Sequence, residues 1–262
     1  MIIAARTPGA RGNLGLAGIV AVWILGVLVL DAGAGIWQQR GLGVGTWVLL
    51  LALLRREPTR VRLQVAVAVI FATCVEYTFA GQLGVYTYRL HNIPSFVPPG
   101  HGLVYLGALA LGRSALFAAA RRTVLAAVLV VGGCWALWGL LLAARRDVLG
   151  AFWFGCLVLF IRRGRAPLVY AGAFLLTAYL ELLGTSLGSW TWGLHDPTGL
   201  LAIGNPPSGV AGGYCFFDAA ALALAPRLAT WLSPATRGRL ARGSAPWGAH
   251  SRHDLAGAAD GG

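Results

Sequence analysis

The phrase LGVYTYRLHN at residues 83–92 returns as LGSWTWGLHD at residues 187–196. Leucine, glycine, two aromatic residues, threonine and histidine keep one register, at an offset of 104 positions (187 − 83). The surrounding sequence repeats as well, because a glutamate precedes each copy (Glu76 and Glu181) and a pair of prolines follows each. The chain is therefore expected to contain two tandem copies of one structural unit.

The sequence around these phrases is typical of a membrane protein. Of its 262 residues, 57% are hydrophobic and 11% are charged, whereas a soluble domain carries about 25% charged residues. Apolar runs such as 14–30 and 123–144 reach or approach the roughly 20 residues that cross a hydrocarbon core as a helix. We expect eight membrane-spanning helices, at about 14–33, 41–54, 62–82, 101–119, 123–144, 147–161, 166–187 and 209–231.

These helices predict an all-α transmembrane bundle made of two four-helix repeats, residues 1–119 and 120–232. Because each repeat has an even number of helices, both keep the same orientation, and a pseudo-two-fold axis along the membrane normal is expected to relate them. The first apolar run is interpreted as a retained helix rather than a cleaved signal peptide. Residues 233–262 are rich in glycine, alanine and arginine, and we expect a disordered cytoplasmic tail there.

All 21 basic residues are arginines, and their placement indicates the orientation of the helices. With the N-terminus in the cytoplasm, most arginines fall at cytoplasmic helix ends, and only Arg40, Arg89, Arg145 and Arg146 face outward. This bias predicts a multi-pass protein of the cell membrane with both termini cytoplasmic. The net charge of +12 then reflects topology, and no nucleic-acid partner is expected.

Three acidic residues inside the expected helices are candidate catalytic groups. Glu76 and Glu181 each lie in the outer half of an apolar span, and Asp218 lies in the last span without a counterpart in the first repeat. A charged side chain within a span is costly and usually faces the bundle interior. Two converging glutamates would not both ionise easily, so one would hold a proton for acid catalysis. The alternatives are loop bracing through backbone N–H groups for the glutamates and helix packing for Asp218.

The aromatic residues of the repeated phrases are candidate substrate-binding residues. Tyr86 and Tyr88 in the first copy correspond to Trp190 and Trp192 in the second. Such rings form an interfacial belt in many membrane proteins. Alternatively, they line a pocket for a flat apolar substrate, where aromatic faces also stabilise a cation.

Histidines and one asparagine complete the candidate binding set. His91 and His195 close the two phrases, His101 opens the fourth expected helix, and Asn205 is placed to bond the backbone of the second proline-bearing loop. No histidine pair has a metal-binding spacing such as HxxxH, and the four cysteines form no CxxC pair. No metal site is therefore expected, and the sequence identifies no cofactor.

The order of an acid, alternating aromatic residues and a proline-bearing loop resembles membrane proteins of carotenoid biosynthesis. The family comprises the carotenoid hydratases and the small lycopene cyclase domains. The matching residues are Glu76, Gly84–Tyr88 and Val97–Pro98 in the first half and Glu181, Gly188–Trp192 and Asn205–Pro207 in the second. The cyclase domains carry paired glutamates near phenylalanines after the proline, whereas a single acid, Asp218, follows Phe216 and Phe217 here. The resemblance implies protonation of an isoprenoid double bond, then water addition or ring closure.

The sequence thus favours an integral membrane enzyme that acts by acid–base catalysis on a lipophilic isoprenoid or carotenoid-like substrate. Two alternatives stay open. One is a small membrane transporter with a central acidic site between the repeats. The other is a non-catalytic assembly protein whose outer loops bind a partner. The oligomeric state does not follow from the sequence.

Overall fold

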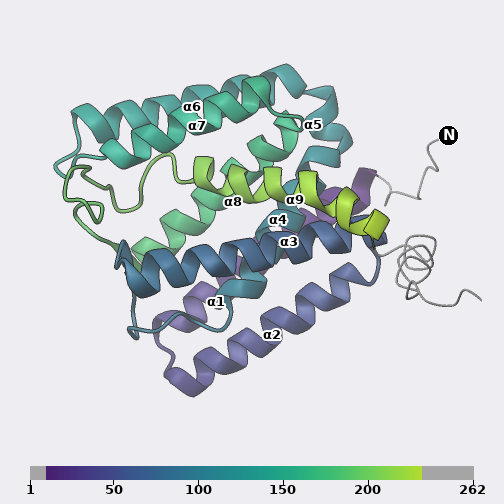
Figure 1. Ribbon diagram of the computed structural model, residues 1–262, viewed down its shortest axis with the longest axis horizontal. Helices are drawn as coiled ribbons and strands as arrows, with labels where there is room; N and C mark the ends of the chain where they lie inside the picture. The colour runs from purple at the N-terminus through teal and green to yellow at the C-terminus, as the bar shows by residue number, and fades with distance from the viewer. Residues whose placement is uncertain (1–9, 232–262) are drawn as a thin grey trace, which may run out of the picture.

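The computed structural model describes residues 10–231, and these residues are mostly helical, as predicted. They contain nine α-helices, a short π-helix and a two-stranded β-ribbon (Figure 1). The elements are α1 (Ala10–Ala32), α2 (Ile36–Leu54), α3 (Thr59–Glu76), η1 (Tyr77–Gln82), β1 (Tyr86–Tyr88), α4 (Val97–Arg113), α5 (Ala115–Ala119), α6 (Arg121–Leu141), α7 (Val148–Arg163), α8 (Pro167–Ser186), β2 (Trp190–Trp192) and α9 (Ala211–Trp231). The predicted tail, 233–262, lies outside the described residues.

Each predicted helical range coincides with a long helix, but the fourth is divided. The backbone at Ser114 is extended (ψ 145°), which ends α4, and the Ser114 hydroxyl accepts a hydrogen bond from the N–H of Phe117 to cap α5. Four helical segments are long and apolar enough to cross a membrane: Gly12–Ala32, Thr59–Gln82, Arg121–Leu141 and Pro167–Ser186. That all eight predicted helices span the membrane stays a prediction.

Helices α3, α4, α8 and α9 pack against one another in the centre, with α1 and α2 along one edge and α6 and α7 along the other (Figure 1). Small residues allow close approach of the central helices. A Cβ atom at Gly172 of α8 would lie 2.8 Å from the carbonyl oxygen of Ala108 in α4. Helix α4 is buried along most of its length and is the centre of the core.

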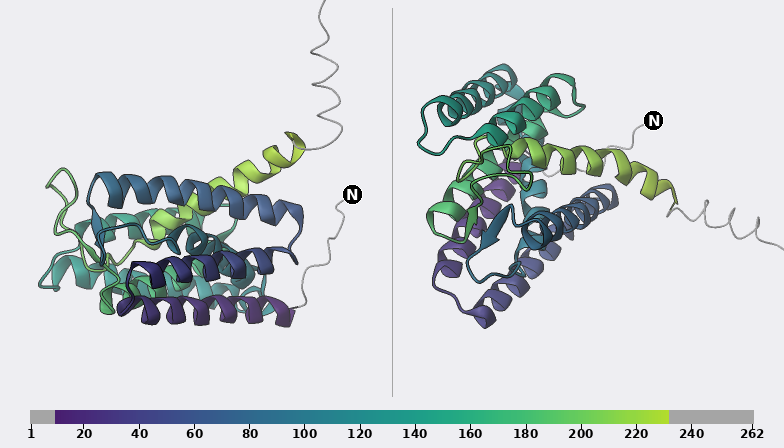
Figure 2. Two further views of the ribbon diagram at one scale, coloured as in Figure 1. Left: turned by 90° about the horizontal axis from the view of Figure 1, so that it is seen from below. Right: turned by 60° about the vertical axis from the view of Figure 1, so that its left-hand side comes forward.

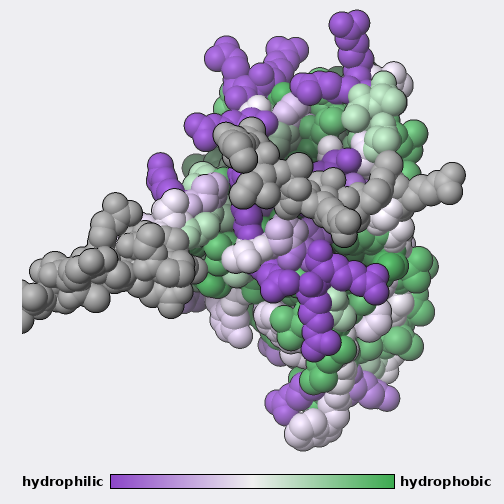
Figure 3. Space-filling model, turned by 90° about the vertical axis from the view of Figure 1, so that its right-hand side faces the viewer, coloured by the Kyte–Doolittle hydropathy of each residue, from purple (hydrophilic) through white to green (hydrophobic). Residues whose placement is uncertain are grey.

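The exterior of the bundle is apolar along its sides and polar at one end. Val22, Leu30, Val48 and Leu141 are all more than 60% exposed, as side chains that face lipid would be. Helix α1 begins and α9 ends at the same end of the bundle (Figure 2). Hydrophilic side chains gather over that end (Figure 3).

The ribbon was not predicted, since the two aromatic phrases were expected to be loops. Strands β1 and β2 pair antiparallel, with Thr87 opposite Thr191, Tyr86 opposite Trp192 and Tyr88 opposite Trp190. The glycine that opens each phrase has a positive φ, 61° at Gly84 and 73° at Gly188, a conformation that favours glycine. Three-residue strands carry almost no pattern of their own, so they become visible only when the two phrases meet in space.

Candidate functional site

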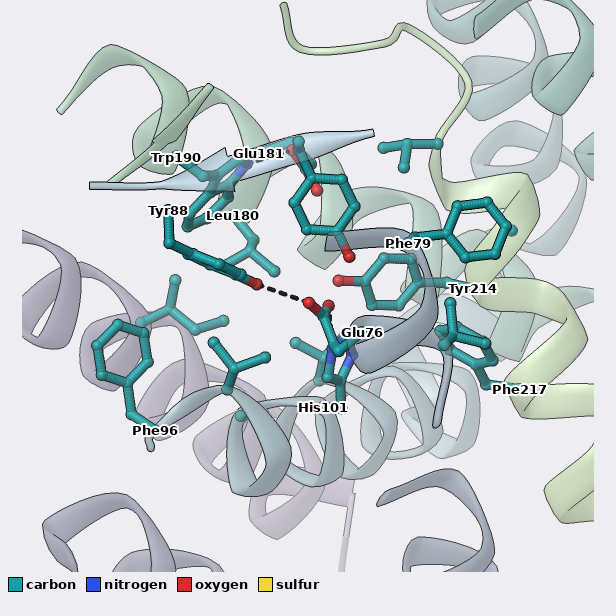
Figure 4. A pocket seen from close by; sticks show the side chains of 18 of the residues that line it. Glu76, Phe79, Tyr88, Phe96, His101, Leu180, Glu181, Trp190, Tyr214 and Phe217 are labelled. Carbon is teal, nitrogen blue, oxygen red and sulfur yellow. Dashed lines mark hydrogen bonds and ion pairs between the residues drawn. The ribbon is translucent and has the colours of Figure 1, made fainter. Parts of the chain in front are cut away.

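A cavity of about 350 Å³ lies beneath the ribbon, among the central helices and the inner faces of α1, α2 and α7. Its wall is mainly aliphatic and aromatic, and polar side chains converge on it at a few points (Figure 4). Glu76 and Glu181 both line it, although 105 positions (181 − 76) separate them in the sequence. Concave, mostly apolar pockets with a few converging polar groups are the usual form of ligand sites.

Glu76 is the last residue of α3, at the point where the helix widens into the π-helix η1. Wider turns of this kind are frequent at functional sites. The Tyr88 hydroxyl donates a hydrogen bond to Glu76 Oε2 at 2.8 Å, and His101 Nε2 lies 2.9 Å from Oε1 (Figure 4). Burial, and next the negative charge of Glu76, raises the pKa of Tyr88 well above its usual range, so the hydroxyl keeps the proton that it donates.

His101 and Glu76 form a buried pair, in which Nε2 and Oε1 lie within hydrogen-bond distance. Both side chains are less than a tenth exposed. The other ring nitrogen, Nδ1, is buried and has no hydrogen-bond partner within the described residues. The ring of Tyr214 packs against the His101 ring, with centroids 5.3 Å apart, and Tyr214 also lines the cavity. The pair is thus mostly buried, and both of its side chains line the cavity.

Glu181 has different partners from Glu76. The indole N–H groups of Trp190 and Trp192 both donate to Glu181 Oε2, each at 3.0 Å. Because an indole nitrogen only donates, Oε2 is the acceptor in both hydrogen bonds. Within residues 10–231 the other oxygen, Oε1, accepts no hydrogen bond, which leaves it for a ligand.

The four aromatic residues of the ribbon form one wall of the cavity. Tyr86, Tyr88, Trp190 and Trp192 are each no more than 8% exposed, and all of them line it. Their rings pack across the strands, with centroids 4.6 Å apart for Tyr86 and Trp192 and 6.1 Å apart for Tyr88 and Trp190. This burial fits a pocket lining better than an interfacial belt, whose rings would be exposed.

Four other predicted site residues lie outside this cavity. His91 and His195 are exposed in the loops, and Asp218 is buried on α9 without lining the cavity. The Asn205 side chain accepts a hydrogen bond from the backbone N–H of Trp192 at 3.0 Å, so it holds β2 in place rather than bonding the backbone of its own proline-bearing loop. The hydrogen bonds of the two glutamates are to side chains rather than to the backbone N–H groups of their own loops.

Sequence reasoning missed several residues of the cavity wall. These residues are aromatic. An aromatic side chain in a membrane helix can face lipid, a cavity or the core, so its residue type alone does not show which of the three it contacts. The labelled examples in Figure 4 are Phe79, Phe96, Tyr214 and Phe217. The two glycines that precede Tyr214 were the only local signal that this part of α9 approaches other elements closely.

An aspartate that sequence reasoning passed over fixes the second outer loop. The buried carboxylate of Asp147 caps α7 by accepting from the N–H of Gly150 at 2.9 Å. It also accepts from the N–H groups of Gly204 at 2.8 Å and Ser208 at 2.6 Å. Nearby, Arg145 donates to the carbonyl oxygens of Trp192 and Ile203. The loop between β2 and α9 is therefore anchored to the start of α7.

An arginine anchors the first outer loop in a similar way. Arg89 donates to the carbonyl oxygens of Asp31 and Ala34 at the end of α1, and the Asp31 carboxylate accepts from the side chain of Gln39 at 2.9 Å. Both strands of the ribbon are thus connected to helix ends by an arginine that donates to backbone carbonyls. These contacts hold the aromatic wall of the cavity in position.

Comparison with models of protein families, with curated proteins and with solved structures finds no match for this chain. The resemblance to proteins of carotenoid biosynthesis therefore stays a prediction. Within the described residues, no group of three or more histidine, cysteine, aspartate or glutamate side chains is placed to hold a metal ion.

Proposed function

We propose that this chain is an integral membrane enzyme that protonates a lipophilic, isoprenoid-like substrate and directs the resulting cation to hydration or cyclisation. One observation carries the proposal. Two carboxylates from distant parts of the sequence line one apolar cavity, and they have different hydrogen-bond partners. When the environments of two titratable groups differ in this way, one group serves as acid and the other as base.

The Glu76–His101 pair is assigned as the proton donor. In this assignment the pair holds one proton between Nε2 and Oε1. That proton moves to one carbon of a substrate double bond, and the π electron pair forms the new C–H bond. The neighbouring carbon is left positively charged. The hydrogen bond from Tyr88 stabilises the Glu76 carboxylate after the proton has gone.

Glu181 is assigned as the anionic partner of the cation and as the proton acceptor. For hydration, a water oxygen donates a lone pair to the cationic carbon and then loses a proton to Glu181. For cyclisation, a second double bond supplies the electron pair, and a C–H bond next to the new cation loses its proton to Glu181. The faces of the four ribbon rings stabilise the cation until this proton is lost.

We further propose that the chain is a tandem repeat of four-helix units with eight spans and both termini cytoplasmic. The ribbon register supports the repeat, because Thr87 and Thr191 stand opposite each other and are equivalent under the 104-residue offset. A two-fold axis between these threonines would produce this pairing. The packing of α3 on α9 and of α8 on α4 fits the same axis. The polar end at which α1 begins and α9 ends supports a shared side for the termini (Figure 3).

The test is conversion of an acyclic carotenoid such as lycopene in membranes that contain the protein. Glu76→Gln and Glu181→Gln each remove one carboxylate with little change in shape. Each is expected to lower the conversion rate by about 100-fold or more, the usual contribution of acid–base groups. Glu57→Gln is the matched control, since Glu57 is buried, pairs with Arg113 at 3.4 Å and lies outside the cavity. Full conversion by both site variants would refute the assignment.

A further inference from the structure

A second apolar hollow, of about 540 Å³, lies between α1 and α2. We call it the α1–α2 groove. Its lining includes Gly18, Val22, Gly26 and Leu30 of α1 and Leu42 and Leu49 of α2. Val22 is 72% exposed and Leu30 is 62% exposed, so the groove opens on the lipid-facing side of the bundle.

The α1–α2 groove and the central cavity share a wall. Trp23 and Val27 line both of them. The Trp23 indole N–H donates to the Thr46 hydroxyl at 3.1 Å, and Thr46 lines the central cavity. The ring lies beside Gly45, where a Cβ would be in van der Waals contact with it at 3.4 Å. The half-buried Trp23 ring, held by one hydrogen bond, and the buried Val27 side chain therefore stand between the two spaces.

The volumes indicate why a ligand would need both spaces. Pockets that enclose a drug-sized ligand measure about 300–1,000 Å³, and the central cavity of about 350 Å³ is at the lower end of that range. It has room for one end of a long hydrocarbon chain but not for the whole chain. The remainder of such a chain must leave the cavity, and the apolar α1–α2 groove begins directly beyond Trp23.

We propose that the cavity and the α1–α2 groove form one extended site for a long linear hydrocarbon. The reacting end lies at the two glutamates, the distal part lies in the groove, and the Trp23 ring is the gate between them. The identity of the reacting end rests on the proposed function. The placement of the distal part rests on the continuity of the two spaces and is measured by binding, without turnover.

Two glycines make the groove open to a direct test. A Cβ at Gly18 or Gly26 would meet no atom within 4 Å, so a larger side chain there projects into the groove without displacing the core. Gly15 provides the matched control, because it lies on the same helix, is equally open and lines neither space. Gly26→Leu therefore fills the groove, whereas Gly15→Leu adds the same side chain elsewhere on α1.

The experiment measures the binding of two radiolabelled isoprenoids to the full chain in lipid nanodiscs. Lycopene is a long acyclic carotenoid, and geranylgeraniol has half its carbon number. Gly26→Leu is expected to weaken lycopene binding by about tenfold or more and to change geranylgeraniol binding by less than about twofold. Gly15→Leu is expected to change neither.

Two results would overturn the extended site. One is equal lycopene binding by Gly26→Leu and Gly15→Leu. The other is an equal loss of both ligands in Gly26→Leu, since the short chain should not reach the groove. If the expected binding pattern is found but wild-type protein converts no isoprenoid, the extended site stands and the proposed function fails. The two proposals are thus tested separately.

Discussion

At the scale of single residues, the difference between the two glutamates is central. Glu76 meets the Tyr88 hydroxyl, which keeps its proton, and the His101 imidazole, a group that can donate or accept one. Glu181 meets two indoles, which donate hydrogen bonds but do not take part in proton exchange. The glutamates that precede the two similar phrases therefore have different environments, in part because tyrosines in the first phrase correspond to tryptophans in the second.

The hydrogen bond from Trp190 to Glu181 depends on how the Trp190 ring packs against α8. The ring lies directly over Gly184 of α8, and a Cβ at that position would collide with it. Gly184→Ala is expected to displace the ring, break its bond to Glu181 and lower stability by about 1–3 kcal/mol, as overpacking does. Thermal unfolding in detergent measures the stability. Gly155→Ala, where a Cβ meets nothing within 4 Å, is the control, and an equal Tm for both variants would contradict this packing.

At the scale of elements, the ribbon depends on contacts made by the outer loops. The Asp147 carboxylate accepts from three backbone N–H groups and connects the start of α7 to the segment that leads into α9. Arg145 binds carbonyl oxygens on the same segment. These contacts keep the second loop close to the bundle, and Asn205 of that loop in turn holds β2.

Loss of the Asp147 carboxylate should therefore loosen the second outer loop. Asp147→Ala removes a helix cap and leaves buried N–H groups unpaired, which is expected to destabilise the protein by about 2 kcal/mol or more. Limited proteolysis between residues 193 and 210, together with thermal unfolding, measures the effect. Asp196→Ala is the control, since Asp196 lies in the same loop and bonds only to neighbouring residues. Equal proteolysis of the two variants would argue against the anchoring role.

The sequence predicted the helices well because apolar runs of this length have few other structures open to them. The break at Ser114 was missed, since a serine inside a helical pattern also occurs without a break. The ribbon was missed because it exists only through a contact between segments more than 100 positions apart. Glu76, Glu181, His101 and the four ribbon aromatics all line one cavity. The sequence singled out these residues but left open whether the two glutamates converge, because that depends on contacts between distant segments.

At the scale of the whole molecule, the cavity needs both parts of the chain. Helices α3 and α4 contribute Glu76 and His101, whereas α8 and β2 contribute Glu181 and its two tryptophans. Asp218, by contrast, was predicted in the same catalytic group but does not line the cavity, although Phe216 and Phe217 beside it on α9 do. In the sequence, too, Asp218 differed from the two glutamates, because it was the one candidate acid with no equivalent acid in the first half of the chain.

The source of the transferred proton tests the proposed chemistry most directly. Membranes that contain the protein are incubated with an acyclic carotenoid in D₂O, and the product is analysed by mass spectrometry. Protonation of a double bond through the Glu76–His101 pair predicts one non-exchangeable deuterium in each product molecule, and both product and label should be lost in Glu76→Gln. A product formed without deuterium, or equal labelling by Glu76→Gln and wild type, would contradict acid catalysis by this pair.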